Sequence, residues 1–222
     1  DFVQILGNVL DIGQPSDDTV TAAKLNNDII SGQTALTAEP DDTDEFLVSD
    51  AGTIKRIDYS LIKGGGVTMA DQFRLNQTFQ GDASPIASNL ERVDTDGFGQ
   101  LGTGMTESSG IFTFPTTGIY LVSFNVHFTT DQSNDSRYNR AVIYTTTDNS
   151  SYSDAVFTAA GLPLVDSSFT SGNAHAQHIF DVTSTSTHKV RFDIDVHNSN
   201  MYISGDTGRS ETYMTFIRLG DT

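Results

Sequence analysis

The sequence predicts an all-β protein, a two-layer β-sandwich of jelly-roll type, preceded by a small N-terminal α+β module. From Val67 onward, short runs of aromatic and β-branched residues alternate with polar, glycine-containing turns. No stretch of that region has the spacing of an amphipathic helix. Gly64–Gly66 separates it from the preceding residues as a flexible joint. We therefore expect two domains, at residues 1–66 and 67–222.

The composition excludes several classes of function. The net charge is −17, which opposes binding to nucleic acid and to anionic lipid. No run of about 18 apolar residues is present, so we expect no membrane insertion. The absence of cysteine excludes disulfides and thiolate metal sites. Asp1–Gln4 lack the basic region of a signal peptide, and we expect none there.

The N-terminal module reads as a set of short elements. Residues 1–16 are apolar without a clear period, and Asp17–Gly32 has a helical pattern, which predicts either self-association or a solitary surface helix. A hairpin is expected over Phe46–Val48 and Thr53–Ile57, followed by a helical turn at Asp58–Ile62. So small a module has little apolar surface to bury alone, which favours oligomerisation.

The central hairpin of the second domain spans Ile111–Phe128. A short apolar strand precedes a turn at Pro115–Gly118, and a long alternating strand follows. Its inward side chains are expected to be Tyr120, Val122, Phe124, Val126 and Phe128, and its outward ones Leu121, Ser123, Asn125 and His127. In all, strands are expected over Phe73–Phe79, Leu90–Val93, Gly110–Phe114, Gly118–Phe128, Arg137–Thr146, Tyr152–Phe157, Ala174–Val182, His188–His197 and Glu211–Leu219.

The last strand is apolar on both faces. Met214 and Phe216 point one way, whereas other apolar residues of the same strand point the other way. One face of a two-sheet sandwich should be solvated, so a second apolar face predicts a subunit interface. The predicted interface residues are Ile119, Leu121, Tyr213, Ile217 and Leu219.

Phe112, Phe114, Pro115, Gly118 and Tyr120 form the pattern F-x-F-P-x-x-G-x-Y. This pattern resembles the core hairpin of C1q-like domains, the trimeric jelly rolls shared with tumour-necrosis-factor (TNF) ligands. The resemblance covers roughly residues 70–220 and implies a homotrimeric head. The collagen-like stalk and the cysteines of animal C1q proteins are missing here.

Ile29–Lys63 and Thr19–Leu25 resemble modules in tail-fibre proteins of bacterial viruses, especially marine ones. This second resemblance implies a bacteriophage tail-fibre protein, located extracellularly in the virion tail fibre or tail tip. Residues 1–66 would then trimerise and attach to tail or baseplate proteins. The head would bind a glycan or protein of the host cell surface.

Strand alternation predicts which loops share an end of the head. The turns Thr116-Thr117, Asp148–Ser151 and Ser184–Thr187 should lie at the base, and Thr129–Ser136, Ala159–Asn173 and Asn198–Ser210 at the tip. The tip loops combine polar side chains with flat aromatic rings, which suits sugar recognition. The candidate receptor-binding residues are Asn134, Arg137, Tyr138, Phe169, Asn198, Asn200, Tyr202 and Arg209.

No motif predicts catalysis or requires a cofactor. The chain has no nucleophile elbow of the G-x-S-x-G type, and its acids lie mostly in turns. Asp94–Gly97 resembles the start of a calcium loop but lacks the closing glutamate, which favours a plain turn. Asp131 and Asp135 are kept as calcium candidates in a tip loop.

These observations favour a receptor-binding tail-fibre protein that attaches a virion to its host and is not an enzyme. Two alternatives stay open. One is a glycan depolymerase on the same fibre, and the other is a purely structural fibre or capping protein.

Overall fold

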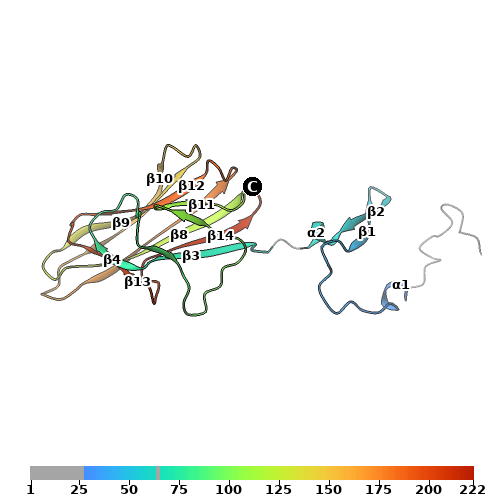
Figure 1. Cartoon of the computed structure of the whole chain (residues 1–222), viewed down its shortest axis with the longest axis horizontal. Helices are drawn as coiled ribbons and strands as arrows, with labels where there is room; N and C mark the ends of the chain where they lie inside the picture. Colours follow the sequence, from blue (N-terminus) through green and yellow to red (C-terminus); the bar gives the residue numbers. More distant parts are fainter. Residues whose placement is uncertain (1–27, 64–65) are drawn as a thin grey trace, which may run out of the picture. The chain divides into compact units, whose positions relative to one another are not determined.

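The computed structural model describes residues 28–63 and 66–222, and the chain divides between Lys63 and Gly64 into two compact units (Figure 1). The apolar segment 1–16 and the predicted helix up to residue 27 lie outside the described residues. Only the last turn of that helix is described, as α1 at Asp28–Ser31. None of the described helices is long and apolar enough to cross a membrane.

The first unit is built on the predicted hairpin. β1 at Glu45–Asp50 pairs with β2 at Thr53–Asp58, and α2 at Tyr59–Ile62 follows directly. Ala51 and Gly52 both have positive φ, at 49° and 87°, which is the backbone that a tight two-residue hairpin turn requires. Several apolar side chains of this unit stay exposed, among them Leu47, Ile54 and Leu61.

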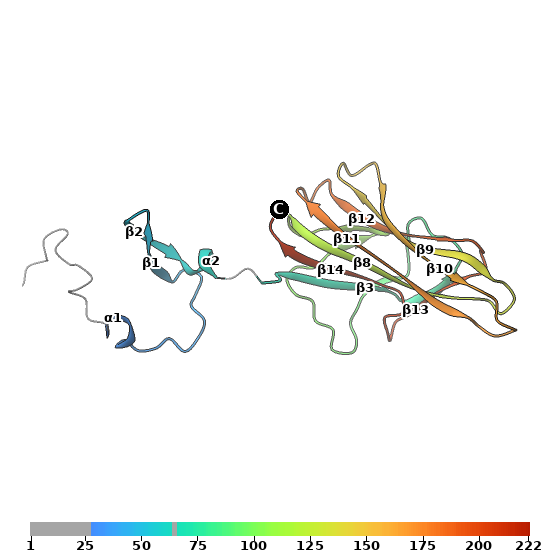
Figure 2. The same cartoon turned by 180° about the vertical axis from the view of Figure 1, so that it is seen from behind.

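The second unit, the head, is a sandwich of two antiparallel sheets. The five-stranded sheet has the order β10-β9-β12-β7-β6, and the seven-stranded sheet has the order β4-β13-β8-β14-β3-β5 with β11 also paired to β8. Figure 2 shows β11, β8, β14 and β3 side by side. The bounds are β3 Met69–Leu75, β4 Gln77–Gln80, β5 Leu90–Arg92, β6 Thr106–Ser108, β7 Ile111–Thr113, β8 Gly118–Thr129, β9 Ser136–Thr146, β10 Ser153–Leu162, β11 Ser171–Val182, β12 Lys189–Val196, β13 Tyr202–Asp206 and β14 Tyr213–Gly220.

The core lies between the sheets and is rich in aromatic rings. Phe112 lies 5.1 Å from Phe216 and 5.3 Å from Phe192, measured between ring centroids, and Phe192 lies 4.9 Å from Phe124. These residues come from four different strands, so their packing joins the two layers. The alternation predicted for Gly118–Phe128 is confirmed, because every predicted inward side chain is fully buried.

Several predicted strand limits are wrong. The strand expected over Phe73–Phe79 is interrupted at Asn76, where the chain moves from pairing with β14 to pairing with β13. β6 and β13 were expected to be loop, because their residues are mainly polar and β13 contains glycine. β10 runs on to Leu162 and β11 starts at Ser171, so the connection between them is shorter than expected.

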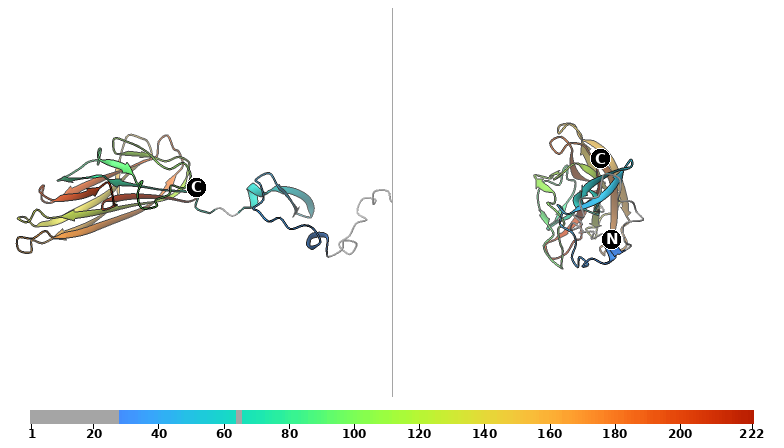
Figure 3. Two further views of the ribbon diagram at one scale, coloured as in Figure 1. Left: turned by 60° about the horizontal axis from the view of Figure 1, so that its bottom comes forward. Right: turned by 90° about the vertical axis from the view of Figure 1, so that its right-hand side faces the viewer.

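The predicted division into base and tip is confirmed for the turns between the long strands, which run lengthwise along the head (Figure 3). At the base, the amide of Asn149 donates to the carbonyl of Thr187 at 2.9 Å. At the tip, the amide of Thr130 donates to the carbonyl of Thr170 at 2.9 Å. The register also pairs Met69 with Arg218, so the head's first and last strands meet at the base.

Candidate functional site

A shallow cavity of about 230 Å³ lies on the outer face of the seven-stranded sheet, at its tip end. Its walls are two aromatic side chains and three hydroxyl side chains. They are Phe169, Tyr202, Thr78, Thr129 and Ser204. Phe169 and Tyr202 are both predicted receptor-binding residues, and they come from segments more than thirty residues apart in the sequence.

Strand pairing holds these side chains in place. Tyr202 begins β13, where it lies opposite Thr129 of β8 on one side and Gln80 of β4 on the other. Thr78 Oγ1 lies 3.2 Å from the carbonyl oxygen of Gly205 and 3.1 Å from its amide nitrogen, and so fixes β4 against β13. The hydroxyls of Thr78 and Thr129 and the Tyr202 ring therefore stand on rigid strands.

Phe169 belongs to the connection between β10 and β11 and reaches the cavity from its rim. The neighbouring residue Thr170 exchanges hydrogen bonds with Thr130, because each amide donates to an oxygen of the other residue at 2.9 Å. The ring of Phe169 stays 58% exposed. A large exposed ring on an anchored loop provides a contact surface at small entropic cost.

The chemistry of the cavity fits an uncharged ligand that has both an apolar face and hydroxyl groups. None of its five lining side chains is charged. The two rings can cover the apolar face of a sugar, and the hydroxyls of Tyr202 and Ser204 can donate to or accept from its oxygens. The hydroxyls of Thr78 and Thr129 already bond to Gly205 and Ser171 and shape the floor of the cavity. No carboxylate lines the cavity that could act as an acid, a base or a metal ligand.

The other predicted receptor-binding residues lie elsewhere at the tip. Arg137 contacts His197 through its Nε atom at 3.1 Å, and the Tyr138 ring packs edge-on against the same histidine at 5.5 Å. Asn198 Nδ2 donates to the carbonyl of Asp135 at 3.2 Å, and the carbonyl of Asn200 accepts from Gln80 at 3.1 Å. These contacts tie the tip loops together beside the cavity.

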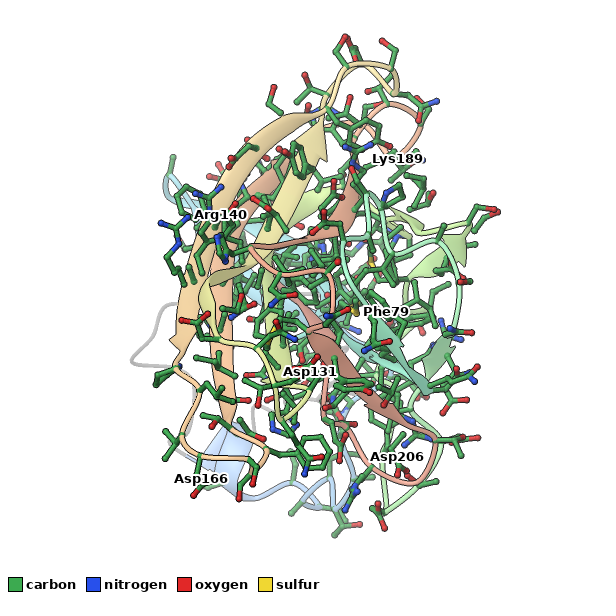
Figure 4. The ribbon with its side chains drawn as sticks, turned by 90° about the vertical axis from the view of Figure 1, so that its left-hand side faces the viewer. Phe79, Asp131, Arg140, Asp166, Lys189 and Asp206 are labelled. Atoms are coloured by element: carbon green, nitrogen blue, oxygen red, sulfur yellow. The ribbon has the colours of Figure 1, made fainter. Side chains whose placement is uncertain are left out.

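Asn134 and Arg209 take part in local contacts of their own. Asn134 donates to Asp131 through both its amide and its side chain, at 2.8 Å each. Arg209 pairs with Glu211 at 2.9 Å, on the connection between β13 and β14. Figure 4 shows Asp206, at the start of that connection, and Asp166 toward opposite margins, with Asp131 between them. Arg209 does not line the cavity.

The calcium candidates do not gather a ligand set. Both carboxylate oxygens of Asp131 already accept hydrogen bonds from Ser133 and Asn134. Partial burial raises the pKa of Asp131, but these hydrogen bonds outweigh it and leave the pKa below its ordinary value. Within residues 28–63 and 66–222, no group of three or more acidic or histidine side chains is placed to hold a metal ion.

The Asp94–Gly97 segment serves the fold instead of binding calcium. Asp94 accepts from Nη2 of Arg74 at 2.7 Å, and Thr95 accepts from Nη1 at 2.8 Å. Arg74 is fully buried, and its Nε also donates to Glu91 at 2.7 Å. Asp94, the first acid of the calcium-like pattern, therefore neutralises the buried guanidinium of Arg74.

An apolar row crosses the outer face of the seven-stranded sheet near the base. The register places Ile179 opposite Leu121, Leu121 opposite Ile217, and Ile217 opposite Ala70. The register places four of the five predicted interface residues on this face, namely Ile119, Leu121, Tyr213 and Ile217, whereas Leu219 lies at a break in the register. Ile179 is 63% exposed, and Ala70, Leu121 and Ile217 are half-buried, so the row is partly open to solvent in the single chain. We call the row Ala70, Leu121, Ile179 and Ile217 the outer apolar row.

Toward the tip, the same face becomes polar. The next row pairs Gln177 with Ser123, Ser123 with Thr215, and Thr215 with Gln72. Gln177 Nε2 donates to Ser123 Oγ at 3.1 Å. The outer face thus runs from an apolar base through a polar middle to the cavity.

Sequence reasoning missed several residues of both surfaces. Thr78 and Ser204 lie in β4 and β13, which were not recognised as a pair of strands. Ile179 alternates out of phase with the buried Phe180 and Val182, and this alternation was the signal that could have identified it.

No protein-family model and no curated protein matches this chain. Among solved structures, the Eiger TNF of S. frugiperda is 12% identical with a TM-score of 0.51, over 71% of this chain and 96% of that one. Murine APRIL at pH 5.0 is 14% identical with a TM-score of 0.48, over 68% of this chain and 98% of that one. The head therefore has a TNF/C1q-like jelly-roll fold.

Proposed function

We propose that this chain is a receptor-binding protein of a bacteriophage tail fibre, whose trimeric head attaches the virion to host-cell glycans. The observation that carries the proposal is the tip cavity, where Phe169 and Tyr202 meet the hydroxyls of Thr78, Thr129 and Ser204. Rings beside neutral hydroxyls are the chemistry that recognises sugars. The cavity opens at the tip, and the strands enter and leave the head at its base.

The outer apolar row supports trimer assembly. A monomeric soluble protein rarely leaves such a row uncovered, and the C1q-like proteins that the central hairpin resembles are trimers. Three copies of a weak sugar site bound to one surface gain avidity of about 10²–10⁴ over a single site. Assembly would thus allow three weakly binding cavities to hold the virion firmly on the cell surface.

The first unit supports attachment to a larger fibre. Its hairpin leaves Leu47, Ile54 and Leu61 exposed, and these residues need a partner surface. Because Ile29–Lys63 resembles tail-fibre modules, we expect this partner to be a tail or baseplate protein. The chain would then reside in the virion, with the head directed outward.

A depolymerase is less well supported. Glycoside hydrolysis uses a pair of carboxylates on either side of the scissile bond, and the tip cavity is lined by none. A purely structural role does not explain an open aromatic cavity at the tip.

A glycan array probed with the purified protein tests this function. We expect binding to a defined glycan that falls at least about tenfold in Tyr202→Ala and in Phe169→Ala, because each removes a ring that covers the sugar. Leu164→Ala is the matched control, since Leu164 is an exposed apolar residue on the same connection as Phe169. Release of oligosaccharides would favour the depolymerase, and undiminished cell adsorption by both ring variants would favour the structural role.

A further inference from the structure

A second groove, of about 310 Å³, lies on the outer face of the five-stranded sheet and plays no part in the proposed glycan site. β9 and β12 supply most of its lining, and the bridge between Ala83 and Ile194 brings the segment 82–84 alongside β12. Phe157 of β10 contributes from the other side. The lining residues are Asp82, Ser84, Arg140, Val142, Tyr144, Asp154, Phe157, Asp193, Ile194 and Asp195.

The cations of this face are already engaged. Arg140, labelled in Figure 4, pairs with Asp195 at 2.9 Å and lies over the ring of Phe157 at 5.1 Å. Arg191 is held between the rings of Tyr144 and Tyr152, at 4.8 Å from each centroid. The stacked guanidinium makes one hydrogen bond, from Nη2 to Asp193 at 3.3 Å, and its Nε is buried without a partner among the described residues.

Asp193 is therefore a buried acid without a full set of partners. Only 7% of its side chain is exposed. Its Oδ2 atom accepts from the Ser84 hydroxyl, whereas Oδ1 is buried and accepts no hydrogen bond from the described residues. Burial raises the pKa of Asp193, although Ser84 and Arg191 act in the opposite direction. A buried carboxylate oxygen without a donor carries a free-energy cost, and here it places negative charge beneath the groove.

Two further acids give the groove a net negative charge. Asp82 uses its Oδ1 to accept from the amide of Val196 at 2.7 Å, and no described cation forms an ion pair with it. Asp154 likewise forms no ion pair within the described part of the chain. Asp195 is the acid that Arg140 neutralises. Such a groove attracts a cation, and no described cluster has the geometry of a metal site.

We propose that this groove binds a primary ammonium group. Asp82 and Asp154 would act as its counter-charges at the surface of the groove, and the charge of Asp193 would add to the attraction from beneath it. The ring of Phe157 would cover the carbon atoms next to the nitrogen and add a cation–π contribution. A polyamine, a lysine side chain and an amino sugar all carry this group, so the chemistry is shared and the source is decided by experiment.

Isothermal titration of the full chain tests the groove with three probes: cadaverine, a lysine methyl ester and a glucosamine tetramer. The N-acetylated form of each probe serves as its ligand control, because acetylation removes the charge. We expect at least one amine to bind at millimolar concentration or tighter and its acetylated form to lose about tenfold or more in affinity. The tightest of the three amines identifies the source.

Protein variants locate the binding. We expect Asp154→Asn and Phe157→Ala, both at exposed or half-exposed positions, to lower the affinity for the amine about threefold or more. We expect Asp193→Asn to lower this affinity more strongly. Asp166→Asn and Leu164→Ala are the matched controls, since they change a surface acid and an exposed apolar side chain outside the groove. Failure of all three amines to bind, equal binding of the acetylated probes, or equal loss in the controls would overturn the proposal. Phe169→Ala also separates this groove from the tip cavity, because it should weaken glycan binding at least about tenfold without affecting the binding of cadaverine.

Discussion

Ile179 and Leu121 lie directly opposite each other on β11 and β8, with both side chains on the outer face of the seven-stranded sheet. Leu121 is in turn opposite Ile217 of β14, so apolar side chains face outward on three adjacent strands. The described residues leave Ile179 63% exposed. A second copy of the chain is the partner that the fold and the C1q-like hairpin both favour.

The first prediction follows from this row. Leu121→Glu and Ile179→Glu should each convert the trimer to a monomer, because assembly would bury a carboxylate without a partner. The monomer should keep its fold, since both side chains lie on the outer face of the sheet, where Ile179 is exposed and Leu121 is half-buried. Size-exclusion chromatography with light scattering measures the mass, and Leu164→Glu at the tip should leave it unchanged. A wild-type chain that is monomeric at micromolar concentration would remove the basis for this interface.

The buried ion pairs of Arg74 give a prediction about stability. Arg74→Met should lower the free energy of unfolding by about 3 kcal/mol, because Glu91 loses a charged donor in a partly buried site. Arg209→Met is the control, since Arg209 is an exposed partner of Glu211 and should cost less than about 1 kcal/mol. Urea unfolding followed by circular dichroism measures both. Similar losses in the two variants would contradict the special role of Arg74.

Glu91 gives a pH dependence. Partial burial acts to raise the pKa of Glu91, but hydrogen bonds from Arg74, Thr207 and Asn76 outweigh it, so the pKa in the fold lies below its ordinary value of 4.5. As the pH falls, the unfolded chain binds this proton first. The stabilisation by ionised Glu91 is therefore complete above about pH 5 and is lost as the pH falls through the folded pKa.

The Glu91→Gln variant measures that contribution. We expect it to unfold at a lower temperature than the wild type at pH 7, and the difference should shrink steadily between about pH 5 and pH 3. Thermal scans at matched ionic strength provide the comparison. A difference that stays constant over this range would show that the charge of Glu91 does not stabilise the fold.

The sequence was sufficient for those parts of the fold that depend on local pattern. The long strand from Gly118 to Thr129 follows from strict alternation, and the outward apolar positions on β8 and β14 follow from the same period. β13 was missed because Gly205 and Asp206 resemble turn residues. That segment becomes a strand through its pairing with β4 and β8, which is a tertiary effect.

The sequence predicted individual residues of the candidate site but not their arrangement in space. Phe169 and Tyr202 stood out as aromatic residues in polar loops, but nothing local predicts that they share a cavity with Thr78. Their convergence depends on the pairing of Tyr202 with Thr129 and on the bonds between Thr130 and Thr170. The same limit explains Arg209, which has suitable chemistry but pairs with Glu211 and does not line the cavity.

The last prediction couples assembly to attachment. If three tip cavities act together on one surface, Leu121→Glu should reduce adsorption to host cells by about 10²-fold or more while each cavity keeps its affinity for a soluble monovalent glycan. Tyr202→Phe, which keeps the ring and removes one hydroxyl, should instead lower the affinity for the soluble glycan modestly. It should leave the mass of the trimer unchanged. Adsorption assays and titration with the monovalent glycan separate these effects. Equal losses of soluble and surface binding in Leu121→Glu would mean that the cavity itself depends on the neighbouring subunit, because a site independent of assembly loses only its avidity when the trimer dissociates.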